Sequence, residues 1–264
     1  MVEPDVLLDR VDVSTAIIRL NRPSRRNAIG ANFATSLNAV LDEIERDRRV
    51  VVAVLTGNGS AFCAGGDISE IMSPDPTDRD EEFALLRSYH KLVGRIHHFD
   101  IPIIAAVNGP AVGGGASLAM ACDVALGSHD AYYSLAFQQI GLSGADMGAT
   151  TLLQRQLGPM RASHLILTGG SITAQQAVEL GLFVEAVASE DLIPRAIQIA
   201  ASIAAGGRGV ATMSKLSLRR GALMELEAAL EYEAFVQSYA FQSPTHKMRI
   251  QQIREKGMPH RARP

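Results

Sequence analysis

The stretch IPIIAAVNGPAVGGGASLAM, residues 101–120, places three consecutive glycines between an apolar run and a segment with the composition of a helix. The run at 101–107 is continuously apolar, which is typical of a parallel strand that is buried on both faces. Glycine loses more backbone entropy on folding than any other residue, so three in a row at 113–115 require a reason. We expect them to leave backbone N–H groups accessible at the start of a helix, where an oxygen atom can approach the donors closely.

A second glycine-rich junction, FCAGGDI at 62–68, follows another apolar run, VVAVLT at 51–56. In a parallel sheet both junctions lie at the carboxyl edge, where ligands bind. Tight packing of strand against helix is an alternative reason for the glycines. Nucleotide-binding fingerprints do not fit, because G-x-G-x-x-G fails at Leu118 and the stretch has no P-loop lysine. The sequence therefore favours two loops whose backbone donors converge on one developing negative oxygen.

The rest of the chain predicts an α/β core followed by a helical segment. Strand-like runs occur at 6–20, with a hairpin turn at 12–14, and at 51–56, 101–107, 123–126 and 131–135. Helices are expected around 33–44 and 83–96, from Pro159, before the glycines at 206–207 and from Pro244. A polar stretch at 73–82 predicts a surface loop. Strands and helices alternate first and helices accumulate later, so the fold class is α/β.

Helical spacing also predicts which side chains form the apolar faces of two of these helices. The first face is expected to consist of Phe33, Leu37, Val40, Leu41 and Ile44. The second is expected to consist of Phe83, Leu86, Tyr89, Val93 and Ile96.

Composition bounds the class of protein. The chain has 264 residues, 47% of them hydrophobic, which is enough for one large domain with a sizeable core. A net charge of −3 argues against a nucleic-acid partner. No apolar run reaches the length of a membrane helix, and the first residues lack a signal-peptide pattern. Cys63 and Cys122 are not spaced as a metal site, so we expect reduced thiols, no metal, no membrane partner and a cytoplasmic location.

Four stretches, taken together, resemble the enoyl-CoA hydratase/isomerase (crotonase) family. They are NRPSRRNAI (21–29), AFCAGGDI (61–68), IPIIAAVNGPAVGGGASLAMACD (101–123) and LTGGSITAQQAVELGLFVEAV (167–187). The resemblance implies a core of stacked ββα units over residues 1–200 and a helical trimerisation or lid segment over 201–264. It also implies a homotrimer or homohexamer that binds acyl-CoA thioesters, with coenzyme A as part of the substrate and no permanently bound cofactor.

The resemblance assigns roles to the glycine junctions. The backbone N–H groups of Gly66 and Gly114 would form an oxyanion hole for the thioester carbonyl. Ala64 would lie beside the adenine, with its carbonyl accepting a hydrogen bond from the exocyclic amine. Cys63 neighbours the proposed hole and is expected to be a buried thiol rather than a nucleophile.

A basic loop and a short helix complete the implied coenzyme A site. Arg25 and Arg26 stand where the basic loop of the family meets the phosphates, although solvated surface charge is an alternative. Asp67 would cap the short helix that follows it. The other residues expected around the coenzyme are Ala28, Gly65 and Ile68.

Hydratases of the family use two glutamates as general acid and base, and this chain lacks both. Ser117 stands three residues after the oxyanion glycine, and Phe137 stands at the second position. A hydroxyl and a phenyl ring do not perform that proton transfer at neutral pH. This argues against ordinary hydration and favours other lyase or isomerase chemistry through a thioester enolate.

A different carboxylate is available in the loop GLSGADMG, residues 141–148. Some isomerases of the family take the proton with a carboxylate from this loop, and here it would be Asp146. The alternative role for Asp146 is to cap a helix that begins at Met147. Phe137 and Gly144 are expected to line the substrate pocket.

Two further alternatives stay open. Ser117 in GASLA loosely resembles a nucleophile elbow and would make a thioesterase if a histidine activated it. The histidines considered are His129, at a predicted turn, and His90 and His97, which lie near an apolar helical stripe. The last alternative is a protein that binds acyl-CoA without catalysis.

Overall fold

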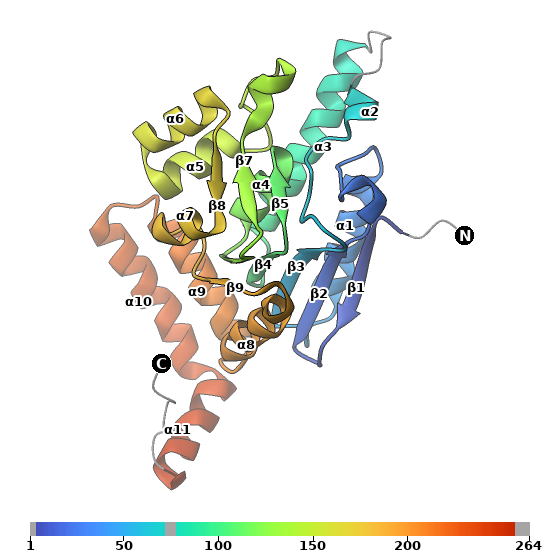
Figure 1. Cartoon of the computed structure of the whole chain (residues 1–264). Coiled ribbons are helices and arrows are strands. Elements are labelled where there is room, and N and C mark those ends of the chain that lie inside the picture. The colour runs from blue at the N-terminus through green and yellow to red at the C-terminus, as the bar shows by residue number, and fades with distance from the viewer. Residues whose placement is uncertain (1–3, 72–77, 257–264) are drawn as a thin grey trace.

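The computed structural model describes residues 4–71 and 78–256 (Figure 1). The main sheet has the strand order β1-β2-β3-β4-β6-β9, in which β1 and β2 are antiparallel and the other neighbours are parallel. Its strands are β1 (Val6–Arg10), β2 (Thr15–Leu20), β3 (Val52–Gly57), β4 (Ile103–Val107), β6 (Val124–Ser128) and β9 (Ala186–Val187). A smaller sheet consists of β5 (Pro110–Val112), β7 (Tyr132–Ser134) and β8 (Ser171–Thr173).

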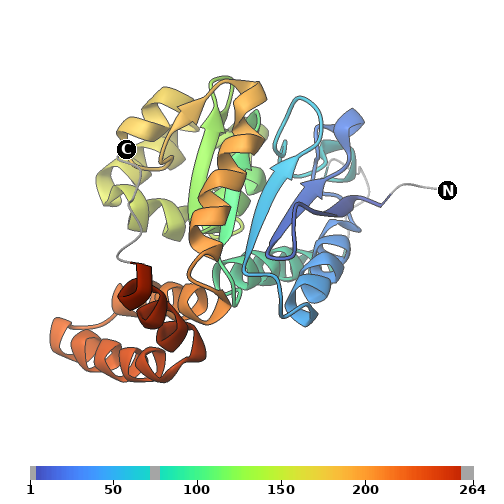
Figure 2. The same ribbon diagram turned by 90° about the horizontal axis from the view of Figure 1, so that it is seen from below.

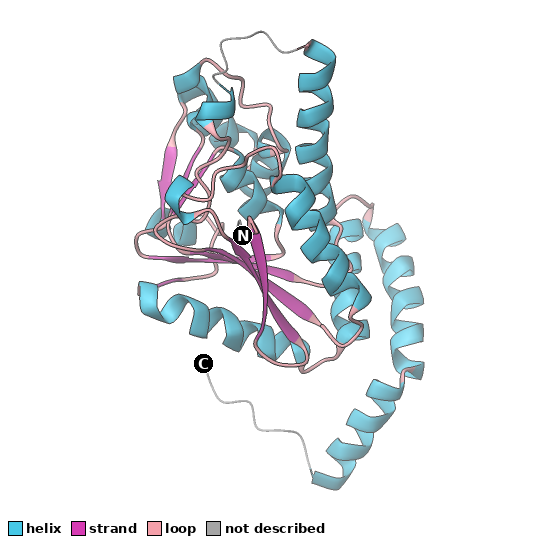
Figure 3. Cartoon of the chain, turned by 90° about the vertical axis from the view of Figure 1, so that its right-hand side faces the viewer, coloured by secondary structure: helices cyan, strands magenta, loops and turns pink. Residues whose placement is uncertain are grey.

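Helices cover both faces of the main sheet, as Figure 3 shows. On one face Val52 and Val54 pack against α8 (Leu192–Ala204). On the other, Ala53 and Leu55 belong to the large core. That core includes residues of α1 (Phe33–Arg46), α3 (Arg79–His97) and α4 (Gly114–Ala121). The double burial explains why the strands have continuous apolar runs, and it confirms the prediction for 51–56 and 101–107.

The chain beyond β7 is mostly helical, as predicted. The remaining helices are α2 (Ile68–Ile71), α5 (Ala149–Leu157), α6 (Pro159–Thr168), α7 (Ala174–Glu179), α9 (Arg208–Gly221), α10 (Leu226–Gln242) and α11 (Pro244–Lys256). Short 3-10 turns are η1 (Pro23–Arg25), η2 (Ala136–Ile140) and η3 (Ser189–Asp191). The predicted boundary between the core and the C-terminal segment, at residue 200, falls within α8. Helices α10 and α11 extend away from the sheets (Figures 1 and 2).

The predicted apolar face of α1 is confirmed, and that of α3 is right at three of its five residues. All five predicted residues of α1 are buried. In α3, Tyr89, Val93 and Ile96 are buried, but Phe83 is 61% exposed and Leu86 is 45% exposed. The first turns of α3 extend past the core, and no other element covers Phe83 or Leu86 within residues 4–71 and 78–256. Residues 73–77 of the predicted loop lie outside the described residues, and residues 79–82 already belong to α3, so this helix begins earlier than predicted.

Within residues 4–71 and 78–256, no helix combines the length and the apolar character needed to cross a bilayer.

A buried ion pair fastens α9 to the end of the sheet. The Nζ atom of Lys215 lies 2.8 Å from Oδ2 of Asp123 and donates to the carbonyl oxygen of Ile101 at 3.0 Å. Arg219 donates to the other oxygen of the Asp123 carboxylate at 3.0 Å. Burial lowers the pKa of Lys215, and the charge of Asp123 opposes that shift. The ammonium group therefore depends on these partners in place of water.

We expect Lys215→Ala to lower the free energy of unfolding by about 3 kcal/mol, because removing one partner leaves a buried charge less well compensated. Equilibrium urea denaturation measures the change. Lys91→Ala is the matched control, since Lys91 is an exposed lysine of α3. Equal stability losses in the two variants would contradict the assignment.

Candidate active site

Short β-bridge pairing holds the two glycine junctions side by side. Cys63 donates through its N–H to the carbonyl oxygen of Pro110 at 3.2 Å, and Val112 donates to that of Cys63 at 2.9 Å. A Cβ atom built at Gly65 would lie 2.7 Å from the oxygen of Val112 and 3.8 Å from the nitrogen of Gly114. The structure thus brings the two loops together, and a side chain at position 65 would prevent this approach.

Gly66 and Gly114 each carry an N–H group that has no acceptor within the described part of the chain. Gly114 is the first residue of α4, and Gly113 before it has a φ of 51°. Gly66 lies in a bridge to Ile29, which is made by the neighbouring amides rather than by its own. Two free donors, one at the positive end of a helix, suit a negatively charged oxygen.

Apolar side chains surround the start of α4. A Cβ atom at Gly114 would lie 2.5 Å from the sulfur of Met147 and 3.0 Å from Cδ1 of Ile29. One at Gly113 would lie 3.3 Å from the ring of Phe137. Met147, Ile29 and Phe137 are all buried. The structure therefore brings Phe137 beside Gly113 and makes the region around the start of α4 apolar.

Both positions where the glutamates were expected are buried and uncharged. Ser117 is fully buried in α4, and its hydroxyl donates to the carbonyl oxygen of Gly113 at 3.5 Å. Among the described residues, no histidine forms a hydrogen bond with Ser117. The contact that thioesterase chemistry requires is therefore not formed in the described structure.

Asp146 faces His90, one of the histidines considered for the activation of Ser117. Its Oδ1 atom lies 3.2 Å from Nε2 of His90 in α3. The side chain of Asp146 is 30% exposed and that of His90 is 46% exposed. The alternative capping role for Asp146 is wrong, because α5 begins at Ala149 and no side chain caps it.

The basic loop that carries Arg25 and Arg26 is hydrogen bonded to the segment at 57–66. Ala64 donates through its N–H to the carbonyl oxygen of Arg26 at 2.9 Å, and the side chain of Asn27 donates to that of Ala61 at 2.8 Å. Arg25 and Arg26 are exposed, and neither pairs with a carboxylate in the described residues. Their guanidinium groups are therefore free of carboxylate partners there, on a loop whose backbone at Arg26 contacts Ala64.

Asp67 occupies the position expected of a cap. Its carboxylate accepts hydrogen bonds from the N–H and the hydroxyl of Ser69 at 3.2 and 2.7 Å, directly before α2. Arg22 donates to its other oxygen at 3.0 Å and to the carbonyl oxygen of Ala28 at 2.8 Å. The hydrogen bond from the Ser69 hydroxyl, helped by Arg22, lowers the pKa of Asp67. The sequence analysis did not assign Arg22 to the site, although Arg22 lies in the basic stretch at 21–29.

Two predicted residues lie apart from these contacts. A Cβ atom at Gly144 would lie 2.6 Å from Cγ2 of Ile166, so Gly144 packs against α6. Ile68 is 56% exposed at the start of α2. A third predicted residue, Ala28, is buried, and its carbonyl oxygen accepts a hydrogen bond from Arg22.

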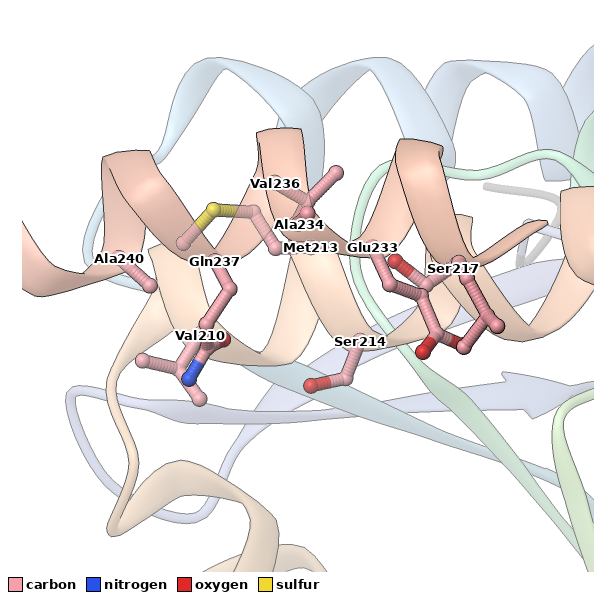
Figure 4. Close-up of a pocket in the computed structure, with 10 residues that line it drawn as sticks. Val210, Met213, Ser214, Ser217, Glu233, Ala234, Val236, Gln237 and Ala240 are labelled. Carbon is pink, nitrogen blue, oxygen red and sulfur yellow. The ribbon is translucent and has the colours of Figure 1, made fainter. Parts of the chain in front are cut away.

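Two cavities lie away from the glycine junctions. One of about 430 Å³ is lined by α9 and α10, with Ser214, Ser217, Glu233 and Gln237 among its polar residues (Figure 4). The other, of about 900 Å³, lies beside Lys215. His97, one of the histidines considered for the activation of Ser117, lines the larger cavity, but Gly66, Gly114 and Asp146 line neither.

The fold and the paired glycine junctions define a crotonase-fold protein. A model of the enoyl-CoA hydratase/isomerase family matches residues 11–262, and the chain belongs to this family. It is therefore an enzyme of the hydratase/isomerase type that acts on acyl-CoA.

Relatives cover nearly the whole chain. A probable enoyl-CoA hydratase of Mycobacterium tuberculosis is 36% identical over 258 residues, which are 95% of this chain and 98% of the relative. The 1,2-epoxyphenylacetyl-CoA isomerase of Escherichia coli is 33% identical over 245 residues, covering 92% and 93%. The crystal structure of an enoyl-CoA hydratase from Bacillus anthracis superposes with a TM-score of 0.91 at 28% identity, covering 97% and 98%.

Proposed function

We propose that this enzyme isomerises the acyl group of a coenzyme A thioester through an enolate, with Asp146 as its acid/base group. The observation that carries the proposal is that the two expected glutamates near α4 are replaced, while a different carboxylate lies on a neighbouring loop. Ser117 and Phe137 are buried at the positions of the two glutamates. Asp146 instead brings a carboxylate on a loop whose next residue, Met147, covers Gly114.

In the proposed reaction the Asp146 carboxylate takes a proton from the α carbon of the thioester. The electron pair of that C–H bond moves to the carbonyl oxygen, which accepts hydrogen bonds from the N–H groups of Gly66 and Gly114. Asp146 then returns a proton to the γ carbon, and a β,γ-unsaturated acyl group becomes α,β-unsaturated. The apolar surroundings formed by Met147 and Phe137 strengthen the two hydrogen bonds, because they lower the local dielectric constant.

The coenzyme is proposed to lie along the basic loop. Arg25 and Arg26 are exposed and would meet its phosphate groups, which suit guanidinium donors. Ala64 is hydrogen bonded to this loop only through its N–H, so its carbonyl oxygen would remain for the adenine amine. Gly65 allows the chain to pass close to α4 at this point.

Assembly into a homotrimer or homohexamer is part of the proposal. Large apolar side chains are exposed on α9, α10 and the segments beside them. They are Leu218, Leu223, Leu226, Leu230, Phe235, Tyr239 and Phe241, each at least 55% exposed. Apolar surface gathered in this way is typical of a protein–protein contact, and further copies of this chain would cover it.

Proton NMR in heavy water with trans-3-hexenoyl-CoA as the probe tests the function. We expect conversion to 2-hexenoyl-CoA with no net addition of water. Formation of 3-hydroxyhexanoyl-CoA from trans-2-hexenoyl-CoA, without conversion of the trans-3 isomer, would instead indicate a hydratase, and release of free coenzyme A would indicate a thioesterase. Binding of both thioesters without conversion or proton exchange would indicate a protein that binds acyl-CoA without catalysis.

A further inference from the structure

The loop that carries Asp146 is fixed from two sides. On one side Met147 places its sulfur over Gly114. On the other the loop packs on α3, where a Cβ atom built at Gly148 would lie 3.8 Å from Cγ1 of Val93. Met147 has a φ of 44°, a left-handed value that residues other than glycine rarely adopt. Such strain persists only where surrounding contacts enforce it, and it gathers at functional sites.

His90 of α3 supplies one of these contacts. Its Nε2 atom lies 3.2 Å from the backbone nitrogen of Met147, and the same atom lies 3.2 Å from Oδ1 of Asp146. A single ring nitrogen serves these two partners in different protonation states. Without a proton it accepts from the Met147 N–H, and with a proton it donates to the carboxylate.

We propose that His90 positions Asp146 and relays its proton to solvent, an inference that rests on the proposed role of Asp146. The carboxylate becomes a carboxylic acid when it takes the proton of the α carbon. The proton then passes from Oδ1 of Asp146 to Nε2 of His90, which regenerates the carboxylate and makes His90 an imidazolium. The imidazolium releases a proton from Nδ1 to water.

The exposure of the pair supports this direction of transfer. The side chain of His90 is 46% exposed, so its ring connects the carboxylate to water. The side chain of Asp146 is 30% exposed, so it is more enclosed than that of His90, and the next residue, Met147, contacts Gly114. By the reverse path a solvent proton reaches the γ carbon. Through the relay, the proton that the γ carbon of the product receives therefore comes from solvent.

The deuterium content of the product tests the relay. Trans-3-hexenoyl-CoA is converted in heavy water, and mass spectrometry measures the deuterium in each molecule of 2-hexenoyl-CoA. We expect wild-type product to carry deuterium at the γ carbon. His90→Gln keeps an acceptor for the Met147 N–H but cannot take up a proton, so its product should contain about tenfold less deuterium. His164→Gln, at an exposed histidine of α6, is the control and should leave the deuterium content unchanged.

Chemical rescue separates the relay from a structural role. Added imidazole should restore deuterium incorporation in His90→Ala, whereas a structural role predicts slower conversion with wild-type deuterium content and no rescue. Wild-type deuterium content in the His90→Gln product, or none in the wild-type product, would overturn the relay alone. A wild-type enzyme that does not convert the probe would overturn the proposed function, and the relay with it.

Discussion

Gly114→Pro is expected to lower kcat for trans-3-hexenoyl-CoA by about 10²–10³-fold, the usual effect of deleting one oxyanion donor. Proline removes the N–H group that has no acceptor among the described residues. Position 114 is the first residue of α4, where the fixed φ of proline suits a helix. Steady-state kinetics measures the loss, and the change should fall on kcat more than on KM.

Gly114→Ala is the matched control for this variant. Its Cβ atom would meet the same two neighbours, the sulfur of Met147 and Cδ1 of Ile29, but its N–H group is retained. Both neighbours are on side chains that can shift, so the control should fold. If the alanine and proline variants lost activity equally, crowding rather than the missing donor would explain the effect.

Asp146→Asn is expected to lower kcat by about 10²–10⁴-fold, the range that general acid–base catalysis contributes. Asparagine has nearly the same shape and still reaches Nε2 of His90, but it cannot take the proton of the α carbon. Binding of the probe, measured by calorimetry, should change little, because the coenzyme contacts proposed above lie at Arg25, Arg26 and Ala64.

Asp130→Asn provides the comparison for Asp146, since Asp130 is an exposed aspartate whose side chain accepts a hydrogen bond from Ser189. It should retain wild-type kcat. Wild-type turnover by Asp146→Asn would remove this carboxylate from the mechanism and would require another base.

Much of the fold was predictable from local patterns. The runs at 51–56 and 101–107 are apolar at every position because α8 covers one face of the sheet and the large core covers the other. Helical spacing identified the buried face of α1. For α3 the same reasoning failed at Phe83, because spacing shows which residues share a face and not whether another element covers that face.

The short strands that complete the site could not be predicted from local sequence patterns. β5 and β8 have three residues each and β9 has two, too few to show a period of alternation. β5 nevertheless sets the position of Gly114, because its backbone pairs with Cys63. Contacts between distant residues were also hidden. His90 and Asp146 are 56 residues apart in the chain, and only the packing of α3 against the loop at 141–148 joins them.

The glycine positions and the substituted glutamates were predicted by resemblance to the family. The structure places Gly65, Gly114 and Phe137 in one region, as expected. Gly144 was also assigned to the pocket; the structure shows its contact with Ile166 of α6, and its place in the pocket stays a prediction. Arg22 lacked a signal of its own, because a basic stretch does not show which of its members turns inward.

The burial of Cys63 has a consequence for the durability of the enzyme. Desolvation raises the pKa of this thiol to about 12, although a hydrogen bond from the backbone of Gly65 opposes the shift. Only the thiolate is a strong nucleophile, and at neutral pH about one molecule in 10⁵ carries it. An α,β-unsaturated thioester is a Michael acceptor that alkylates thiolates. The isomerisation proposed above yields such a thioester, and a cysteine that stays protonated resists conjugate addition to it.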